Sequence, residues 1–125
     1  LPAWLQPSAP APAAPSRPSL EEHRLLPGNQ ECADCAAPRP LWASLNQGVL
    51  ICIECSGVHR ALGTHVSKVK SLGLDAWTAE EVRLFVSKGG NAEVNRRLAA
   101  TAPRPLPGAS RDEIERYIAA KYSAP

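Results

Sequence analysis

All four cysteines of the chain lie in one short stretch between residues 32 and 55. Cys32 and Cys35 form one C-x2-C pair, Cys52 and Cys55 form a second, and 16 residues separate the pairs. Each C-x2-C turn can direct two sulfur atoms at one centre, and four thiolates form the soft tetrahedral shell that zinc prefers. The spacing therefore predicts one zinc per chain, and closing this loop would contribute folding free energy.

Two other uses of the cysteines are less favoured by the sequence. Two disulfides are unexpected because no secretory signal opens the chain. A redox pair needs only two cysteines and a thioredoxin-like βαβ setting. We expect the zinc to be structural, because four cysteine ligands leave no open coordination position for water or substrate.

Composition indicates one small domain. The chain has 125 residues, of which 44% are hydrophobic, and it contains no run of about 18 apolar residues that would span a membrane. A net charge of +2 is too small to indicate nucleic-acid or membrane binding by itself. We therefore expect a soluble, cytoplasmic protein, and because the sequence opens at Leu1 rather than Met, we expect it to be part of a longer one.

Residues 1–18 consist mostly of Pro, Ala and Ser, a composition typical of an extended linker. Within them, Pro12–Arg17 has the P-x-x-P-x-R pattern that SH3 domains can bind, although such matches arise by composition in any Pro-rich segment. The folded domain is predicted to cover residues 19–125.

Three capping boxes predict where helices begin, at Ser19, Thr78 and Ser110, each followed three residues later by a glutamate. The first helix is expected to end near Leu26, before Pro27-Gly28, and the other two carry apolar residues at helical spacing. A further helix is expected over residues 92–100, between Gly89-Gly90 and a proline-rich segment. Strands are predicted at residues 49–53 and 66–72.

The segment that follows the last cysteine, residues 56–77, is rich in basic groups. Ser56 could cap a short helix that carries His59 and Arg60, and no acidic residue lies between Glu54 and Asp75. On composition alone, this segment would be a solvated basic face.

The residues resemble a known family, the zinc-finger GTPase-activating proteins of Arf small GTPases, over residues 20 to about 122. The matching motifs are the cysteine spacing, Trp42-Ala43-Ser44, Gly48-Val49, the run from Cys52 through Gly63, His65 through Leu72, Leu74-Asp75-x-Trp77, Gly90-Asn91-x-x-x-Asn95 and Tyr117-Ile118-x-x-Lys121-Tyr122. Together with the predicted helices and strands, the resemblance implies an α+β fold: a small zinc-finger domain with a short antiparallel sheet surrounded by about five helices.

The resemblance also implies the function, which is activation of GTP hydrolysis by a GTP-bound Arf-family GTPase. In that family the Arg of the C-S-G-[IV]-H-R motif is the arginine finger, and the match places it at Arg60. Trp42, Ile53, Leu74 and Asp75 match positions used around the arginine or against the GTPase. Such a protein is an activator rather than an enzyme in its own right, since it supplies a catalytic arginine to its partner.

Several of these residues also have structural interpretations. Trp42 could simply pack beside the finger, and Asp75 could either orient Arg60 or end a strand. His59 and His65 are expected to be structural, since the water-positioning group should belong to the GTPase. Ala36 departs from the family pattern, where Gly often follows the second cysteine; if this position needs a positive φ, alanine costs about 1 kcal/mol.

Two alternative functions remain. A GATA-type DNA-binding finger has a similar layout, but it needs arginines after the tryptophan and a basic tail, whereas here Trp42 is followed by Ala-Ser-Leu-Asn and the last predicted helix mixes both charges. No nucleic-acid partner is therefore expected. A GTPase-binding scaffold that has kept the fold without the activity is the other alternative. Membrane recruitment is expected only through domains outside this chain.

Overall fold

The computed structural model describes residues 19–98 and 103–123. The predicted linker and its candidate SH3 motif at Pro12–Arg17 lie outside the described residues, so the domain boundary near Ser19 stays a prediction. The described elements are α1 (Leu20–Arg24), the 3-10 helix η3 (Pro27–Gln30), β1 (Trp42–Ser44), β2 (Val49–Ile51), α2 (Ile53–Ala61), β3 (Val69–Ser71), α3 (Ala79–Ser87), α4 (Asn91–Leu98) and α5 (Arg111–Ser123). None of these helices has the length and apolar character needed to cross a membrane.

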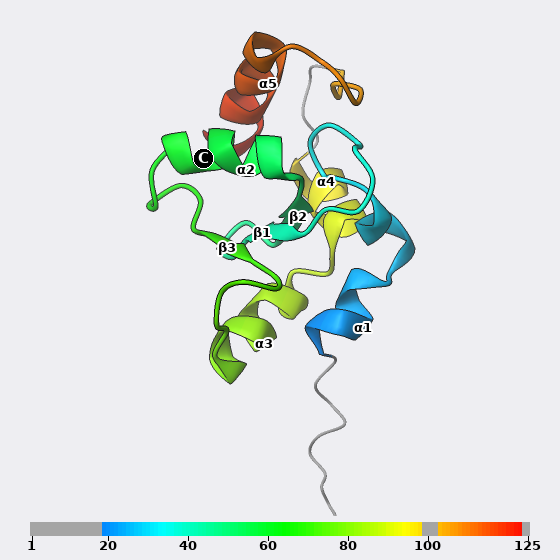
Figure 1. Ribbon diagram of the computed structural model, residues 1–125, viewed down its shortest axis with the longest axis vertical. Coiled ribbons are helices and arrows are strands. Elements are labelled where there is room, and N and C mark those ends of the chain that lie inside the picture. The colour runs from blue at the N-terminus through cyan, green and yellow to red at the C-terminus, as the bar shows by residue number, and fades with distance from the viewer. Residues whose placement is uncertain (1–18, 99–102, 124–125) are drawn as a thin grey trace, which may run out of the picture.

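A three-stranded antiparallel sheet lies at the centre, in the order β2-β1-β3. Trp42 on β1 pairs with Ile51 on β2 and with Ser71 on β3. Helix α2 lies between the sheet and α5 on one side, while α1 and α3 lie on the other side (Figure 1). This arrangement confirms the predicted α+β fold, with five α-helices around a short sheet in the described residues.

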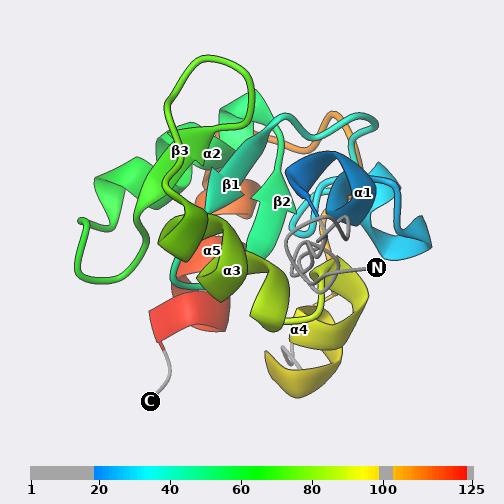
Figure 2. The same cartoon turned by 90° about the horizontal axis from the view of Figure 1, so that it is seen from below.

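The alternation of side chains along the strands builds two apolar clusters. Val49 and Ile51 join the larger cluster, which includes Val58 of α2 and Ile118 of α5. The residue between them, Leu50, points the other way and packs with Ala43 and Phe85. The view from below in Figure 2 shows α3 against the sheet on this second side. The sheet therefore ties the two clusters into one domain.

The helix starts that the sequence predicted are mostly confirmed. Complete capping boxes form at Ser19 with Glu22 and at Thr78 with Glu81. At Ser110, the hydroxyl accepts a hydrogen bond from the Glu113 N–H at 3.2 Å. The first helix ends at Arg24, two residues before the predicted end, and α4 begins at Asn91, one residue early.

The strand predictions were less accurate. The strand predicted over residues 49–53 ends at Ile51, because Cys52 caps α2 with its sulfur. The prediction that Ser56 caps this helix was wrong, since its hydroxyl instead donates to the Ile53 carbonyl within the first turn. The strand predicted over residues 66–72 is limited to Val69–Ser71. Strand β1 was missed, because three residues are too few to show an alternating pattern.

Asn91 closes the outer edge of β2 with its side chain. Its Oδ1 accepts from the Leu50 N–H at 2.7 Å, and its Nδ2 donates to the carbonyls of Leu50 at 3.0 Å and Glu31 at 2.9 Å. The Asn91 N–H donates to Asn29 Oδ1 at 2.8 Å. One buried amide thus takes the place of a neighbouring strand and joins η3, β2 and α4.

We expect Asn91→Ala to lower the free energy of unfolding by about 3 kcal/mol, because it leaves buried backbone groups without partners. Asn46→Ala is the matched control. Asn46 also makes side-chain to backbone hydrogen bonds, but it is exposed, so water can replace them and a change below about 1 kcal/mol is expected. Urea denaturation of both variants measures the difference, and equal losses would contradict the role assigned to Asn91.

Candidate functional site

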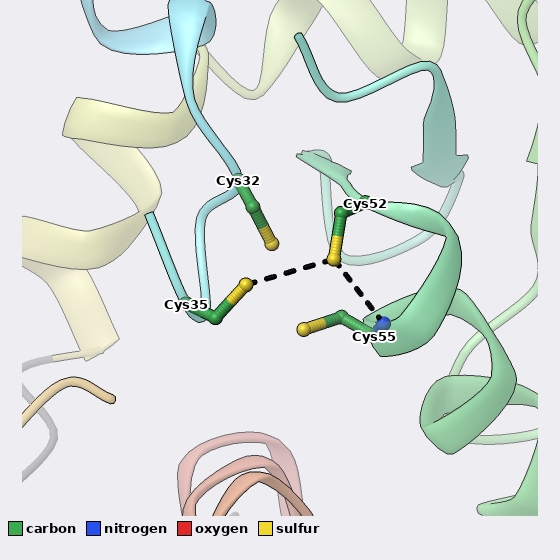
Figure 3. Close-up of side chains that lie close together, drawn as sticks. All are labelled: Cys32, Cys35, Cys52 and Cys55. Atoms are coloured by element: carbon green, nitrogen blue, oxygen red, sulfur yellow. Dashed lines mark hydrogen bonds between the residues drawn. The ribbon is translucent and has the colours of Figure 1, made fainter. Parts of the chain in front are cut away.

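Two separate segments bring the four cysteines together. Cys32 and Cys35 come from the loop between η3 and β1, and Cys52 and Cys55 come from the start of α2. Figure 3 shows their sulfur atoms turned toward one another, and all four Sγ atoms lie within 4.8 Å of each other. The shortest recorded separation, 3.6 Å between Cys35 and Cys52, is far longer than a disulfide bond of about 2.05 Å. The four cysteines are free thiols rather than disulfides.

The donor set suits a tetrahedral cation. Metal–sulfur bonds of about 2.3 Å in a tetrahedron place sulfur atoms about 3.8 Å apart, close to the observed spacing. The Asp34 N–H donates to Cys32 Sγ and the Cys55 N–H donates to Cys52 Sγ, both at 3.4 Å, so backbone amides face one sulfur of each pair. A hydrogen bond with Cys32 and burial raise the pKa of the Cys55 thiol far above its usual range. All four sulfur atoms could be ionised together only beside a cation, and the cluster can hold a metal.

Arg60 lies in the last turn of α2, whereas Cys52 and Cys55 lie at the start of this helix. Arg60 is exposed, and its guanidinium carbon lies 5.1 Å from the centroid of the Trp42 ring, which is a cation–π distance. Among the residues that the structure describes, no carboxylate forms an ion pair with Arg60. The arginine is thus supported by an aromatic ring while its charge stays available to a partner.

Two of the apolar residues that the sequence singled out are exposed. Leu74 is 84% exposed and Ile53 is 67% exposed. An open groove of about 450 Å³ runs beside Trp42, between α1 and the ends of β1 and β3. Leu41, Leu72 and Leu74 line it together with Glu21 and Arg24 of α1. The structure therefore brings Leu74 to the same groove as Trp42, whereas Ile53 lies on the first turn of α2, outside that groove.

Asp75 is placed by the turn that follows β3. Its carboxylate accepts from the Ser71 N–H at 2.7 Å, and the Trp77 indole donates to the Ser71 carbonyl at 3.0 Å. No ion pair between Asp75 and Arg60 occurs in the described part of the chain. Of the two interpretations of Asp75, this geometry is that of a residue ending a strand.

The basic segment is partly neutralised by α3. Lys70 Nζ lies 2.8 Å from Glu81 Oε1, and Lys68 Nζ lies 3.9 Å from the other oxygen of the same carboxylate. The hydrogen bond from Lys70, together with the backbone hydrogen bond from Thr78, lowers the pKa of Glu81 below its usual value. The basic face predicted from composition is therefore interrupted by a carboxylate that lies 11 residues beyond Lys70 in the sequence.

A buried polar network connects the cysteine loop to α2 and α5. His59 is fully buried, with Nε2 at 2.8 Å from Asp34 Oδ2 and Nδ1 at 2.7 Å from Ser67 Oγ. The other Asp34 oxygen accepts from Lys121 Nζ at 2.8 Å and from the Tyr122 hydroxyl at 2.6 Å. His59 thus has the structural role that the sequence predicted.

Asp34 is the ionised centre of this network. Burial opposes its ionisation, but the hydrogen bond with His59 and the charge of Lys121 outweigh burial and hold its pKa below the usual value. Burial and the Asp34 charge raise the pKa of Tyr122, so its hydroxyl stays protonated and donates. Sequence reasoning missed Asp34, whose only signal was a carboxylate placed between two cysteines.

Comparison with known proteins identifies the family. Residues 17–125 match the ArfGap family, described as "Putative GTPase activating protein for Arf". The chain is 51% identical over 98 residues to the ADP-ribosylation factor GTPase-activating protein AGD12 of Arabidopsis thaliana, covering 75% of this chain and 29% of that protein. It is 46% identical over 109 residues to the Arf-GAP with coiled-coil, ANK repeat and PH domain-containing protein 2 of Gallus gallus, covering 83% and 14%.

The fold agrees with that match. The solution structure of the ArfGap domain of human RIP superimposes with a TM-score of 0.71 at 24% identity, over 83% of this chain and 79% of that one. This chain belongs to the ArfGap family. It spans less than a third of the length of the two curated relatives, and its membership favours the first interpretation of the sequence over a GATA-like finger.

Ala36 adopts the left-handed conformation that its position requires. Its φ is 63°, and its N–H donates to the Cys32 carbonyl at 3.0 Å, closing the turn around the first cysteine pair. This position therefore needs a positive φ, and the alanine side chain is held in a backbone conformation that glycine adopts without strain.

We expect Ala36→Gly to raise the free energy of unfolding by about 1 kcal/mol, because relief of the left-handed strain exceeds the added freedom of the unfolded chain. Ala37→Gly is the matched control, since Ala37 is not among the residues with positive φ and its change should be destabilising. Chemical denaturation of the metal-loaded variants measures whether the free energy of unfolding rises in Ala36→Gly and falls in Ala37→Gly. A loss of stability in Ala36→Gly would show that the turn carries no strain.

Proposed function

We propose that this chain accelerates GTP hydrolysis on an Arf-family GTPase by placing Arg60 in the nucleotide site of that GTPase. The observation that carries the proposal is the state of Arg60, which is exposed, free of ion pairs with carboxylates in the described residues, and supported by Trp42. Membership of the ArfGap family supplies the class of partner.

The chemistry follows from what hydrolysis demands. A water held by the GTPase attacks the γ-phosphorus, the bond to the β–γ bridging oxygen breaks, and negative charge grows on the oxygens around that bond. The Arg60 guanidinium is planar, permanently charged and able to donate two parallel hydrogen bonds to those oxygens. The chain therefore acts as an activator that supplies a catalytic residue in trans, while the nucleotide and the water belong to the GTPase.

We assign zinc to the four-cysteine cluster, bound by Cys32, Cys35, Cys52 and Cys55. When bound, it supplies structural closure and no open coordination position for chemistry. Two of the ligands, Cys52 and Cys55, lie at the start of α2, so the metal would fix the end of the helix opposite to the last turn, which carries Arg60. The cysteine loop would thereby set where the helix begins.

We assign the contact with the GTPase to Trp42, which lies against the arginine, and to the exposed apolar side chains of Ile53 and Leu74. The turn that presents Leu74 is held by Ser71, whose hydroxyl accepts from the N–H groups of Gly73 and Leu74. Asp75 accepts from the N–H of the same serine, so its part in the interface would be to order this turn. We expect the reaction to take place in the cytoplasm, with membrane recruitment by segments beyond this chain.

The purified domain should contain one zinc per chain, and a strong chelator should unfold it, because metal binding and folding are coupled in such sites. Elemental analysis measures the zinc, and circular dichroism during chelation measures the folding. A metal-free protein that keeps its thermal transition would contradict the assignment.

Arg60→Lys should lower the saturated single-turnover rate of GTP hydrolysis by roughly 10³ to 10⁵, which is about 4 to 7 kcal/mol of barrier. Lysine keeps the charge but loses the planar fork, so affinity for the GTP-bound partner and the melting temperature should change little. The measurement uses purified Arf proteins loaded with GTP.

Arg97→Lys is the matched control, because Arg97 is an exposed arginine on α4 and its loss should leave hydrolysis unchanged. A near-wild-type rate in Arg60→Lys would rule out the arginine finger. A wild-type domain that binds GTP-loaded Arf without accelerating hydrolysis would favour the scaffold alternative.

A further inference from the structure

The buried network around His59 joins parts of the chain that are far apart in sequence. Asp34 comes from the cysteine loop, Ser67 from the loop before β3, and Lys121 and Tyr122 from the last turn of α5. The Ser67 hydroxyl also lies 2.6 Å from that of Ser44 on β1. His59 therefore connects α2 to the sheet, to the cysteine loop and to the C-terminal helix.

Both ring nitrogens of His59 are hydrogen-bonded, and their partners come from two different segments of the chain. An ionised carboxylate can only accept hydrogen bonds, so the Nε2–H of His59 donates to Asp34. In the neutral imidazole, Nδ1 is then an acceptor for the Ser67 hydroxyl. The Tyr122 ring packs against the imidazole edge to face, with centroids 4.7 Å apart. The plane of the imidazole is thus fixed by two polar contacts and one aromatic contact.

Fixing His59 also fixes the direction in which Arg60 leaves the helix. Neighbouring residues on an α-helix are offset by about 100° around its axis, at 3.6 residues per turn. His59 points into the interior and Arg60 points to solvent, so rotation or tilt of α2 would move both together. A side chain as long as arginine amplifies a small rotation at the backbone into a larger movement of the guanidinium.

We infer that Asp34, Ser67 and Tyr122 are positioning residues for Arg60, acting through His59. This inference rests on the proposed function of Arg60. None of the three residues contacts the arginine; each restrains the one helix residue whose orientation determines where the guanidinium points. Lys121 supports the same arrangement by donating to Asp34 and to the Ala33 carbonyl.

Tyr122→Phe tests the inference with the least disturbance, because it removes only the hydroxyl that donates to Asp34 and keeps the ring beside His59. Ser67→Ala tests it from the other side by removing the partner of Nδ1. A misplacement of about 1 Å in a reacting group can lower the rate about 100-fold. Loss of one contact to His59 should shift the guanidinium by less than this, so we expect the saturated rate to fall about ten-fold.

The experiment is single-turnover GTP hydrolysis on GTP-loaded Arf, with increasing concentrations of zinc-loaded wild type, Tyr122→Phe and Ser67→Ala. A positioning role lowers the saturated rate and leaves the half-saturating concentration unchanged. A merely structural role reduces the folded fraction, which raises the half-saturating concentration and leaves the saturated rate as it is. Zinc content and melting temperature are measured on the same samples.

Phe85→Leu is the control for lost stability, since Phe85 is buried in the cluster on the opposite side of the sheet and has no part in the network. It should lower the melting temperature and keep the saturated rate. Saturated rates within about two-fold of wild type in both network variants would overturn the positioning role while the proposed function stands. A wild type that does not accelerate hydrolysis would overturn both.

Discussion

The convergence of four sulfur atoms is the constraint on which the rest of this structure depends. The sheet has strands of three residues each, and such short strands make few hydrogen bonds and cannot determine how a nine-residue helix sits on them. The cysteine cluster brings the loop after η3 against the first turn of α2, with all four Sγ atoms within 4.8 Å. The position of α2, and with it that of Arg60, follows from this junction.

Single buried polar side chains make the hydrogen bonds between segments that the short strands and helices cannot make. Asn91 satisfies the outer backbone groups of Leu50, and Asp34 collects hydrogen bonds from α5 while holding His59. Each of these residues is almost fully buried and serves segments that are dozens of residues apart. A buried amide or carboxylate is costly unless every partner is in place, so these residues favour one arrangement of the chain over its alternatives.

The sequence predicted the parts of this domain that are encoded locally. The capping boxes at Ser19 and Thr78 can be recognised in the sequence because the two residues of each box are three positions apart. The cysteine pairs can be recognised because their C-x2-C spacing is typical of zinc ligands. Strand β1 and the Asp34 network could not be predicted in the same way. The former is too short to show a period, and the partners of Asp34 include residues 87 and 88 positions away along the chain. Arg60 and its neighbours came from family resemblance, and the structure adds that Trp42 lies against the guanidinium.

The side chains at the two outer strands have a further consequence for the molecule in a crowded solution. A sheet with open edges offers unpaired N–H and C=O groups that can recruit a strand from another chain and begin aggregation. Here the outward groups of Leu50 on β2 are bound by Asn91, and those of Ser71 on β3 are bound by Asp75 and Trp77. The middle of one edge and the end of the other are therefore closed to intermolecular pairing. The exposed side chains of Leu41 and Leu74 and the half-buried ring of Trp42 can therefore lie beside this sheet without its edges becoming a template for self-association.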